Sequence, residues 1–110
     1  MGRNNTERSH LYMYVRSKLN PHAVKVFAAL MPGGDVHAGL YLCGSLLGGQ
    51  GHSCVTDLES GIGYDIMSQT CWGDYIDLGR HLWRCSAEES ALRIMGMLGL
   101  AIAAFEQALA

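Results

Sequence analysis

Charged side chains are scarce in this chain: they make up 16% of its 110 residues, against about a quarter in a typical globular protein. Disordered chains are rich in charge and poor in aromatic residues, so this composition argues against disorder. The charge-free run Ile94–Phe105 is shorter than the ~20 residues needed to cross a bilayer. No apolar segment of about 7–15 residues follows the polar N-terminus, as a secretory signal requires. We therefore expect a cytoplasmic protein with reduced cysteines.

The chain also lacks the motifs of common enzymes and nucleotide-binding proteins. No Lys-Ser/Thr pair follows the glycine-rich loop at residues 48–51, as a phosphate-binding loop requires. The glycines around Ser45 do not have the spacing of a nucleophile elbow. Cys54 and Cys71 are candidate nucleophiles only if a histidine lies within hydrogen-bond reach, so a Cys/His-dependent protein stays open as an alternative. We expect no cofactor, and the sequence favours a protein that is not an enzyme.

Residues 86–109 carry the strongest helix pattern in the chain. Ser86 followed three residues later by Glu89 is typical of a capping box. Glu88 adds negative charge to the first turn, where the helix dipole favours it. The run Ile94–Phe105 is apolar all round and must therefore be buried by its own fold, by a partner or by lipid. We expect a C-terminal helix over residues 86–109 as the spine of the core, with a homodimer as a second hypothesis.

Two stretches alternate as half-buried strands do. Residues 10–16 predict an N-terminal strand, and residues 54–67 predict a hairpin with its turn at residues 59–61. The alternating side chains are Leu11, Met13 and Val15 in the first stretch, and Ile62, Tyr64 and Ile66 after the turn of the second.

Helix signals mark two further segments. Asn20 and Pro21 predict the N-cap and first residue of a helix that ends before Pro32. Residues 73–84 return to helical spacing of apolar residues. The segment 35–47 stays open between a helix and a buried strand, because each central glycine costs up to about 1 kcal/mol in a helix.

Together these elements predict an α+β fold, in which a short antiparallel sheet (the N-terminal strand plus the central hairpin) packs on two to four helices. At this length we expect a single domain over residues 10–110, preceded by a flexible basic tail, residues 1–9. Gly2 and Thr6 also fit the loose pattern for N-myristoylation, although an unmodified N-terminus is the favoured interpretation.

Positive charge gathers near the N-terminus. Residues 1–25 carry five basic residues and one acid, a net charge of +4, whereas residues 26–110 carry three basic residues and nine acids, a net charge of −6. A strand followed by two helices resembles the order of ribbon–helix–helix DNA-binding proteins, whose ribbon enters the major groove. A DNA-binding regulator is therefore one alternative. Its nucleic-acid contact would be made by Arg8, Tyr12, Tyr14, Arg16 and Lys18.

A zinc-binding protein is another alternative, because the chain has four cysteines and five histidines. Zinc needs three or four nitrogen or sulfur ligands arranged as a tetrahedron. The chain has no CxxC knuckle, and free cysteines are often simply buried, so core thiols are the competing interpretation. If the hairpin lies against the helix at residues 73–84, the ligand set is His52, Cys54, Cys71, His81 and Cys85.

Aromatic and charged residues gather between positions 72 and 83. Trp, Tyr and Arg dominate the hot spots of protein interfaces, although core packing explains the same aromatic residues equally well. The predicted partner-binding residues are Trp72, Asp74, Tyr75, Arg80 and Trp83.

The favoured hypothesis is a small interaction protein that binds a protein or a protein–nucleic acid complex as an inhibitor or adaptor. It follows from the missing catalytic set, the low charge and the aromatic cluster. Small proteins without motifs are often encoded by phages or mobile elements. In its most specific form, the hypothesis is that the protein is encoded by a phage or mobile element and binds a defence complex of the host.

Overall fold

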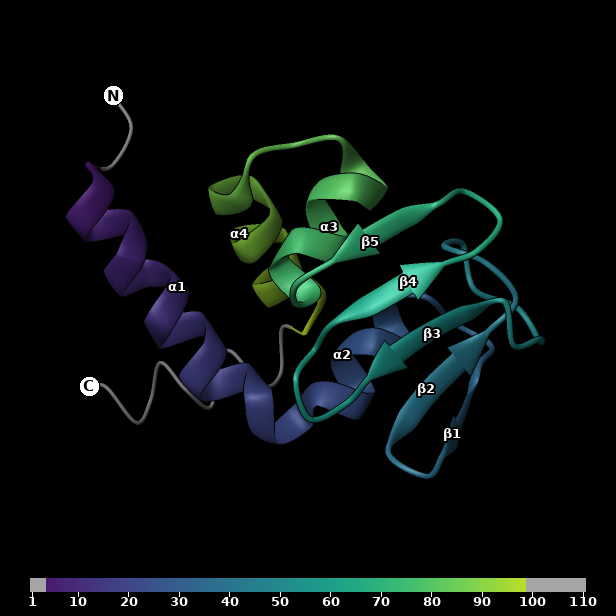
Figure 1. Ribbon diagram of the computed structural model, residues 1–110. Coiled ribbons are helices and arrows are strands. Elements are labelled where there is room, and N and C mark those ends of the chain that lie inside the picture. The colour runs from purple at the N-terminus through teal and green to yellow at the C-terminus, as the bar shows by residue number, and fades with distance from the viewer. Residues whose placement is uncertain (1–3, 99–110) are drawn as a thin grey trace.

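A sheet of short strands lies beside a group of helices (Figure 1). The computed structural model describes residues 4–98, so Gly2 and residues 99–109 of the predicted C-terminal helix lie outside the described range. The predicted α+β class is confirmed. In chain order the elements are α1 (Asn5–Leu19), the 3-10 helix η1 (Asn20–His22), α2 (Ala23–Leu30), β1 (Asp35–His37), β2 (Leu40–Cys43), β3 (Cys54–Asp57), β4 (Gly63–Asp65), β5 (Thr70–Trp72), α3 (Tyr75–Trp83) and α4 (Ala87–Met97). Within residues 4–98, no helix is long and apolar enough to cross a membrane.

The strands form one antiparallel sheet in the order β1-β2-β3-β4-β5. One row of residues in register crosses β2 to β5 through Tyr41, Thr56, Gly63 and Trp72, and all four residues are buried. Because successive side chains of a strand point to opposite faces, this row defines the covered face of the sheet. Helix α2 contacts β2 and helix α3 contacts β5, and Figure 1 shows α2 behind the sheet with α1, α3 and α4 beside it.

Residues 10–16 lie in helix α1, so the prediction of an N-terminal strand is wrong. Asn4 caps the start of the helix, because its side-chain oxygen accepts the backbone N–H of Glu7 at 2.8 Å. Its buried residues, Val15 and Leu19, stand four apart, which is helical spacing. Met13, predicted to share a face with Val15, is 67% exposed. A short stretch of alternating apolar residues is compatible with both the two-residue period of a strand and the 3.6-residue period of a helix. Here the residues that contact the core are one helical turn apart, which favours the helix.

Two further predictions depended on that strand. The ribbon–helix–helix order needs it, so that order is not formed in the part of the chain described here. The sheet is instead completed by β1, β2 and β5 around the central hairpin. Helix α1 begins at Asn5, so residues 5–9 of the predicted tail form its first turns, while the flexibility of that tail stays a prediction.

The segment 35–47, left open between helix and strand, forms strands β1 and β2. The two residues between them, Ala38 and Gly39, have φ angles of 50° and 79°, as a type I′ hairpin turn requires. The predicted central hairpin is confirmed as β3 and β4. Asp57 holds its turn, because its carboxylate accepts the N–H groups of Glu59 and Ser60 at 2.8 and 3.1 Å.

Helices α3 and α4 pack closely, and α4 also packs on α1. The buried Ser90 hydroxyl donates to the Ile76 carbonyl at 2.6 Å across the pair. A Cβ built on Gly79 would overlap that hydroxyl, so glycine permits the close approach. Ser86 caps α4 as predicted, because its hydroxyl accepts the backbone N–H of Glu89 at 3.1 Å. The predicted C-terminal helix is confirmed over Ala87–Met97.

Replacing Gly63 with alanine tests how Trp72 packs on the sheet. A Cβ on Gly63 would overlap the Trp72 indole, whereas a Cβ on Gly73 meets no described atom within 4 Å. We expect Gly63→Ala to lower the free energy of unfolding by about 1–3 kcal/mol, the usual cost of overpacking. Gly73→Ala, the control, should change it by less than about 0.5 kcal/mol. Urea unfolding followed by tryptophan fluorescence measures both, and equal stabilities would contradict this packing.

Candidate functional site

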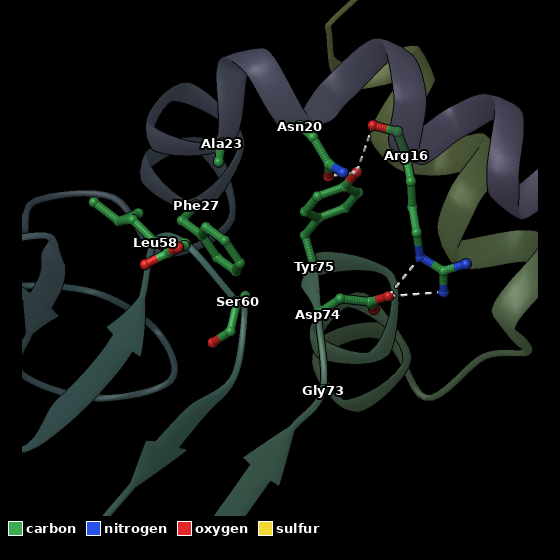
Figure 2. A pocket seen from close by; sticks show the side chains of 11 residues that line it. Arg16, Asn20, Ala23, Phe27, Leu58, Ser60, Gly73, Asp74 and Tyr75 are labelled. Atoms are coloured by element: carbon green, nitrogen blue, oxygen red, sulfur yellow. Dashed lines mark hydrogen bonds and ion pairs between the residues drawn. The ribbon is translucent and has the colours of Figure 1, made fainter.

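A pocket opens where α1, η1 and α2 approach the β3–β4 turn and the start of α3 (Figure 2). Its volume is about 230 Å³. Residues from segments 16–27, 58–61 and 73–75 line it. In Figure 2, Arg16 and Asn20 reach from the helices towards Asp74 and Tyr75, and Ser60 lies across the gap. The pocket therefore joins three parts of the chain that are far apart in sequence.

An ion pair connects α1 to the start of α3. The Arg16 guanidinium donates from Nε to one oxygen of the Asp74 carboxylate at 2.8 Å, and its Nη2 lies 2.7 Å from the same oxygen in an ion pair. The other oxygen of Asp74 caps α3 by accepting the Asp77 N–H at 2.9 Å. One carboxylate thus fixes where α3 begins and holds α1 beside it. Both side chains are partly exposed, so the ion pair itself contributes about 1 kcal/mol or less.

Tyr75 makes the second connection between the helices. Its hydroxyl donates to Asn20 Oδ1 at 2.7 Å, and its ring meets the Phe27 ring edge-on, with 6.0 Å between the centroids. Burial raises the pKa of the Tyr75 phenol above its usual range, and the Asp74 carboxylate raises it further, while the Arg16 guanidinium opposes the rise. The phenol is therefore protonated at neutral pH and acts as a donor.

Several polar groups that line this pocket hold the fold together. Its lining contains no cysteine or histidine. The Ser60 hydroxyl accepts the Ile62 N–H at 3.2 Å, and the Asp74 carboxylate and Tyr75 phenol hold the helices. Nucleophilic catalysis needs a nucleophile with a base beside it, and the described lining residues form no such pair.

The second feature is the face of the sheet opposite Trp72. One row in register crosses all five strands on this face, through Asp35, Leu42, Val55, Tyr64 and Cys71. Ile62 and Ile66 flank the three-residue β4, two positions before and after Tyr64, and extending the strand alternation by one residue at each end places them on its side. These three large side chains are 59%, 45% and 59% exposed, and we call them the β4 stripe: Ile62, Tyr64 and Ile66.

The β4 stripe is unusual for a solvent-facing strand. Antiparallel sheets with one covered face usually place polar residues on the other face. Here the stripe lies between the partly buried Val55 of β3 and the exposed Cys71 of β5. No described helix lies in front of β2, β3 and β4 in Figure 1. Exposed apolar patches larger than a few hundred Å² are a common feature of interaction sites, so the β4 stripe is a candidate site.

The predicted partner-binding residues lie in different environments. Trp72 and Tyr75 are buried in the core, as the competing interpretation of these aromatic residues held. Asp74 and Arg80 line a shallow hollow beside α1, and Arg80 is exposed. Trp83 is partly buried, with an arginine guanidinium of α4 4.5 Å from its ring centroid. A partner contact by the last three residues stays a prediction.

The predicted nucleic-acid residues all lie on helix α1. Arg8 is exposed in its first half. The Arg16 guanidinium lies 5.8 Å from the Tyr12 ring centroid, and the Lys18 ammonium lies 5.8 Å from that of Tyr14. In each pair the cation stands four residues after the aromatic ring, so the two side chains lie on the same side of the helix. Since Arg16 is also neutralised by its ion pair, only part of the predicted basic charge faces solvent, and nucleic-acid binding stays a prediction.

The predicted zinc ligands do not come together. Within residues 4–98, no group of three or more His, Cys, Asp or Glu side chains is placed to hold a metal ion. Cys54 is buried on the covered face of β3, whereas Cys71 is exposed on the opposite face of β5. His52 and His81 are exposed, in the loop before β3 and on α3, and Cys85 is partly buried after α3.

Sequence reasoning found the residues of the β4 stripe as part of a strand but not as a site. The apolar side of an alternating strand is expected to face the core. In β4 the other side is buried, through Gly63 and Asp65. The signal was the glycine itself, because a strand position without a side chain indicates close approach by another group.

Comparisons with protein-family models, with curated proteins and with solved structures found no match.

Two variants of Asp74 separate its two roles. Asp74→Asn retains a capping oxygen and loses the ion pair, so we expect the free energy of unfolding to fall by about 1 kcal/mol or less. Asp74→Ala loses the cap as well, which adds about 1 kcal/mol. Arg16→Met removes the same ion pair and serves as the control for Asp74→Asn. Urea unfolding measures all three, and equal losses for both Asp74 variants would show that the cap contributes nothing.

Thiol reactivity tests the placement of the four cysteines. Cys43 and Cys54 are 0% exposed, and burial raises the pKa of both thiols. We expect the exposed Cys71 to react first with Ellman's reagent. Cys43 and Cys54 should react only on unfolding, because the thiolate is the reactive form and burial disfavours it. Cys71→Ser should remove the fast phase, and Cys54→Ser should leave it. A native protein whose buried thiols react as fast as Cys71 would contradict the structure.

Proposed function

We propose that this chain is a protein-binding domain whose partner docks on the uncovered face of the sheet. The β4 stripe is the observation that carries the proposal. Its three side chains are about half exposed, although isoleucine, which occupies two of the three positions, is a type that folding normally buries. Covering apolar surface releases about 25 cal/mol per Å², so a partner that seats on the stripe gains free energy that the isolated domain leaves unused.

The shape of this face favours a macromolecule over a small ligand. Small-molecule sites are concave and enclose most of their ligand. The stripe belongs to a strand surface and is not part of the pocket in Figure 2. Side chains two apart on a strand are about 7 Å apart, so the stripe from Ile62 to Ile66 extends about 14 Å. Tyr64 at its centre has the large ring and polar tip that interface hot spots favour.

The charge of this face favours a protein over nucleic acid. Residues 26–79 contain no lysine or arginine, and all five strands lie inside that segment. Binding to nucleic acid depends on Lys and Arg that neutralise phosphates. The basic residues of α1 lie outside this face. An inhibitor or adaptor that covers a protein surface is the class of function that this arrangement supports.

Photo-crosslinking from position 64 tests the proposal. Tyr64 is replaced by p-benzoylphenylalanine, which keeps an aromatic ring at the centre of the stripe. Leu47, in the β2–β3 loop and 83% exposed, is replaced in the control variant. Both proteins are expressed in cells of the native source, irradiated, and treated with nuclease before mass spectrometry.

We expect position 64 to capture a defined protein that Leu47 does not. The captured protein, once purified, should bind the wild-type chain directly. Its dissociation constant should rise at least tenfold for Ile62→Asp/Ile66→Asp, because the variant places two charges where the apolar contact forms. The same adduct from both positions would overturn the proposal. So would loss of the adduct on nuclease treatment, or an adduct of twice the chain's own mass, which would identify a second copy.

A further inference from the structure

Acidic side chains border the uncovered face of the sheet. Asp35 lies in the same row as Tyr64, at the β1 end of that row. Asp57 lies at the end of β3, and Glu59 lies in the turn that leads to Ile62, where it also lines the pocket of Figure 2. All three are exposed, and none forms an ion pair within the described residues. The open face therefore carries acidic residues near the start of the stripe, at Asp57 and Glu59, and on β1, two strands away from β4, at Asp35.

The lysines and arginines that precede and follow the sheet in the sequence belong to the helices. Arg16 reaches the pocket of Figure 2, where Asp74 already holds its guanidinium. Lys25, on α2, is exposed and lines a hollow beside Leu58 on the helical side of the β3–β4 turn. Neither is on a strand. The next basic residue along the chain is Arg80, on α3.

We infer that the partner presents a basic, apolar segment to this face, with apolar side chains on the β4 stripe and Lys or Arg side chains at Asp35, Asp57 and Glu59. This inference rests on the proposed function and names the chemistry of the partner. Two chains that meet through an apolar centre and an oppositely charged rim are steered together before contact. The carboxylates accept charge-assisted hydrogen bonds from the partner's cations.

Each carboxylate has room for such a contact. One oxygen of Asp57 holds the turn by accepting two backbone N–H groups, which leaves its second oxygen for a cation. Asp35 and Glu59 have no side-chain hydrogen bond in the described residues. Removing the charge of these two therefore changes the electrostatics of the face and leaves the β3–β4 turn intact.

Peptides of matched length test the sign of charge without the natural partner. Three nine-residue peptides alternate valine with lysine, with glutamine or with glutamate. Each is titrated into the uniformly ¹⁵N-labelled full chain, and amide shifts are followed by two-dimensional NMR. We expect the lysine peptide to shift the amides of Tyr64 and Ile66. Its affinity should exceed that of the glutamate peptide at least tenfold at low salt and fall as salt screens the rim.

Charge-neutral variants provide the matched control. Asp35→Asn/Glu59→Gln should weaken binding of the lysine peptide at least threefold. Glu7→Gln/Glu89→Gln removes the same number of charges from α1 and α4 and should leave it unchanged.

The outcomes separate this inference from the proposed function. Equal shifts by all three peptides, or tighter binding of the glutamate peptide, would overturn the inference and leave docking on the stripe standing. Shifts confined to α1 would overturn it too, because the peptide would then bind elsewhere. If no peptide shifts the stripe at millimolar concentration, the inference is also wrong, while photo-crosslinking still decides the proposed function.

Discussion

Four consecutive residues, Trp72–Tyr75, hold the sheet and the helices together. The Trp72 indole lies over Gly63 and covers the inner face of the sheet at β4 and β5. Asp74 caps α3 and pairs with Arg16 of α1. Tyr75 packs on Phe27 and donates its hydroxyl to Asn20. Since β5 ends and α3 begins within this segment, the chain has little freedom to place the helices elsewhere.

This constraint has a consequence for the other face of the sheet. Helix α2 lies behind the sheet and the other described helices lie beside it, so the outward row through Tyr64 has no described helix over it. The covered face takes Gly63 and the buried Asp65 from β4, and Tyr64 between them points outward. A half-exposed side chain contributes less to the stability of the isolated domain than a buried one. On our proposal, Tyr64 and the two isoleucines that flank β4 serve binding.

Local signals in the sequence predicted much of the fold. Ser86 and Glu89 marked the start of α4, and the alternation around residues 59–61 marked the central hairpin. These signals work because a cap or a turn is decided by neighbours in sequence. The stretch at residues 10–16 failed because its alternation was short, and contact between α1 and α4 decided its structure. A tertiary contact of that kind cannot be predicted from a short segment of the sequence.

The candidate site was harder to predict, for a related reason. Trp72 and Tyr75 have the residue types of an interface hot spot, yet both are buried. Residue type alone does not say which face a side chain occupies, and a shift by one position moves it to the other side of a strand. The ion pair of Arg16 with Asp74 joins residues 58 positions apart. Each had been assigned to a different predicted site, and no pattern along the chain connects them.

The distribution of charge connects the scarcity of basic residues with the exposed stripe. An apolar strand on an open sheet face is a hazard, because two copies can associate through it. On our proposal, the acidic residues that border the stripe reduce this hazard, since like charges on two copies repel. The three-residue β1 at the edge of the sheet also offers little backbone for pairing. The same carboxylates attract a partner of opposite charge, so one arrangement opposes self-association and favours the basic segment that the face is inferred to bind.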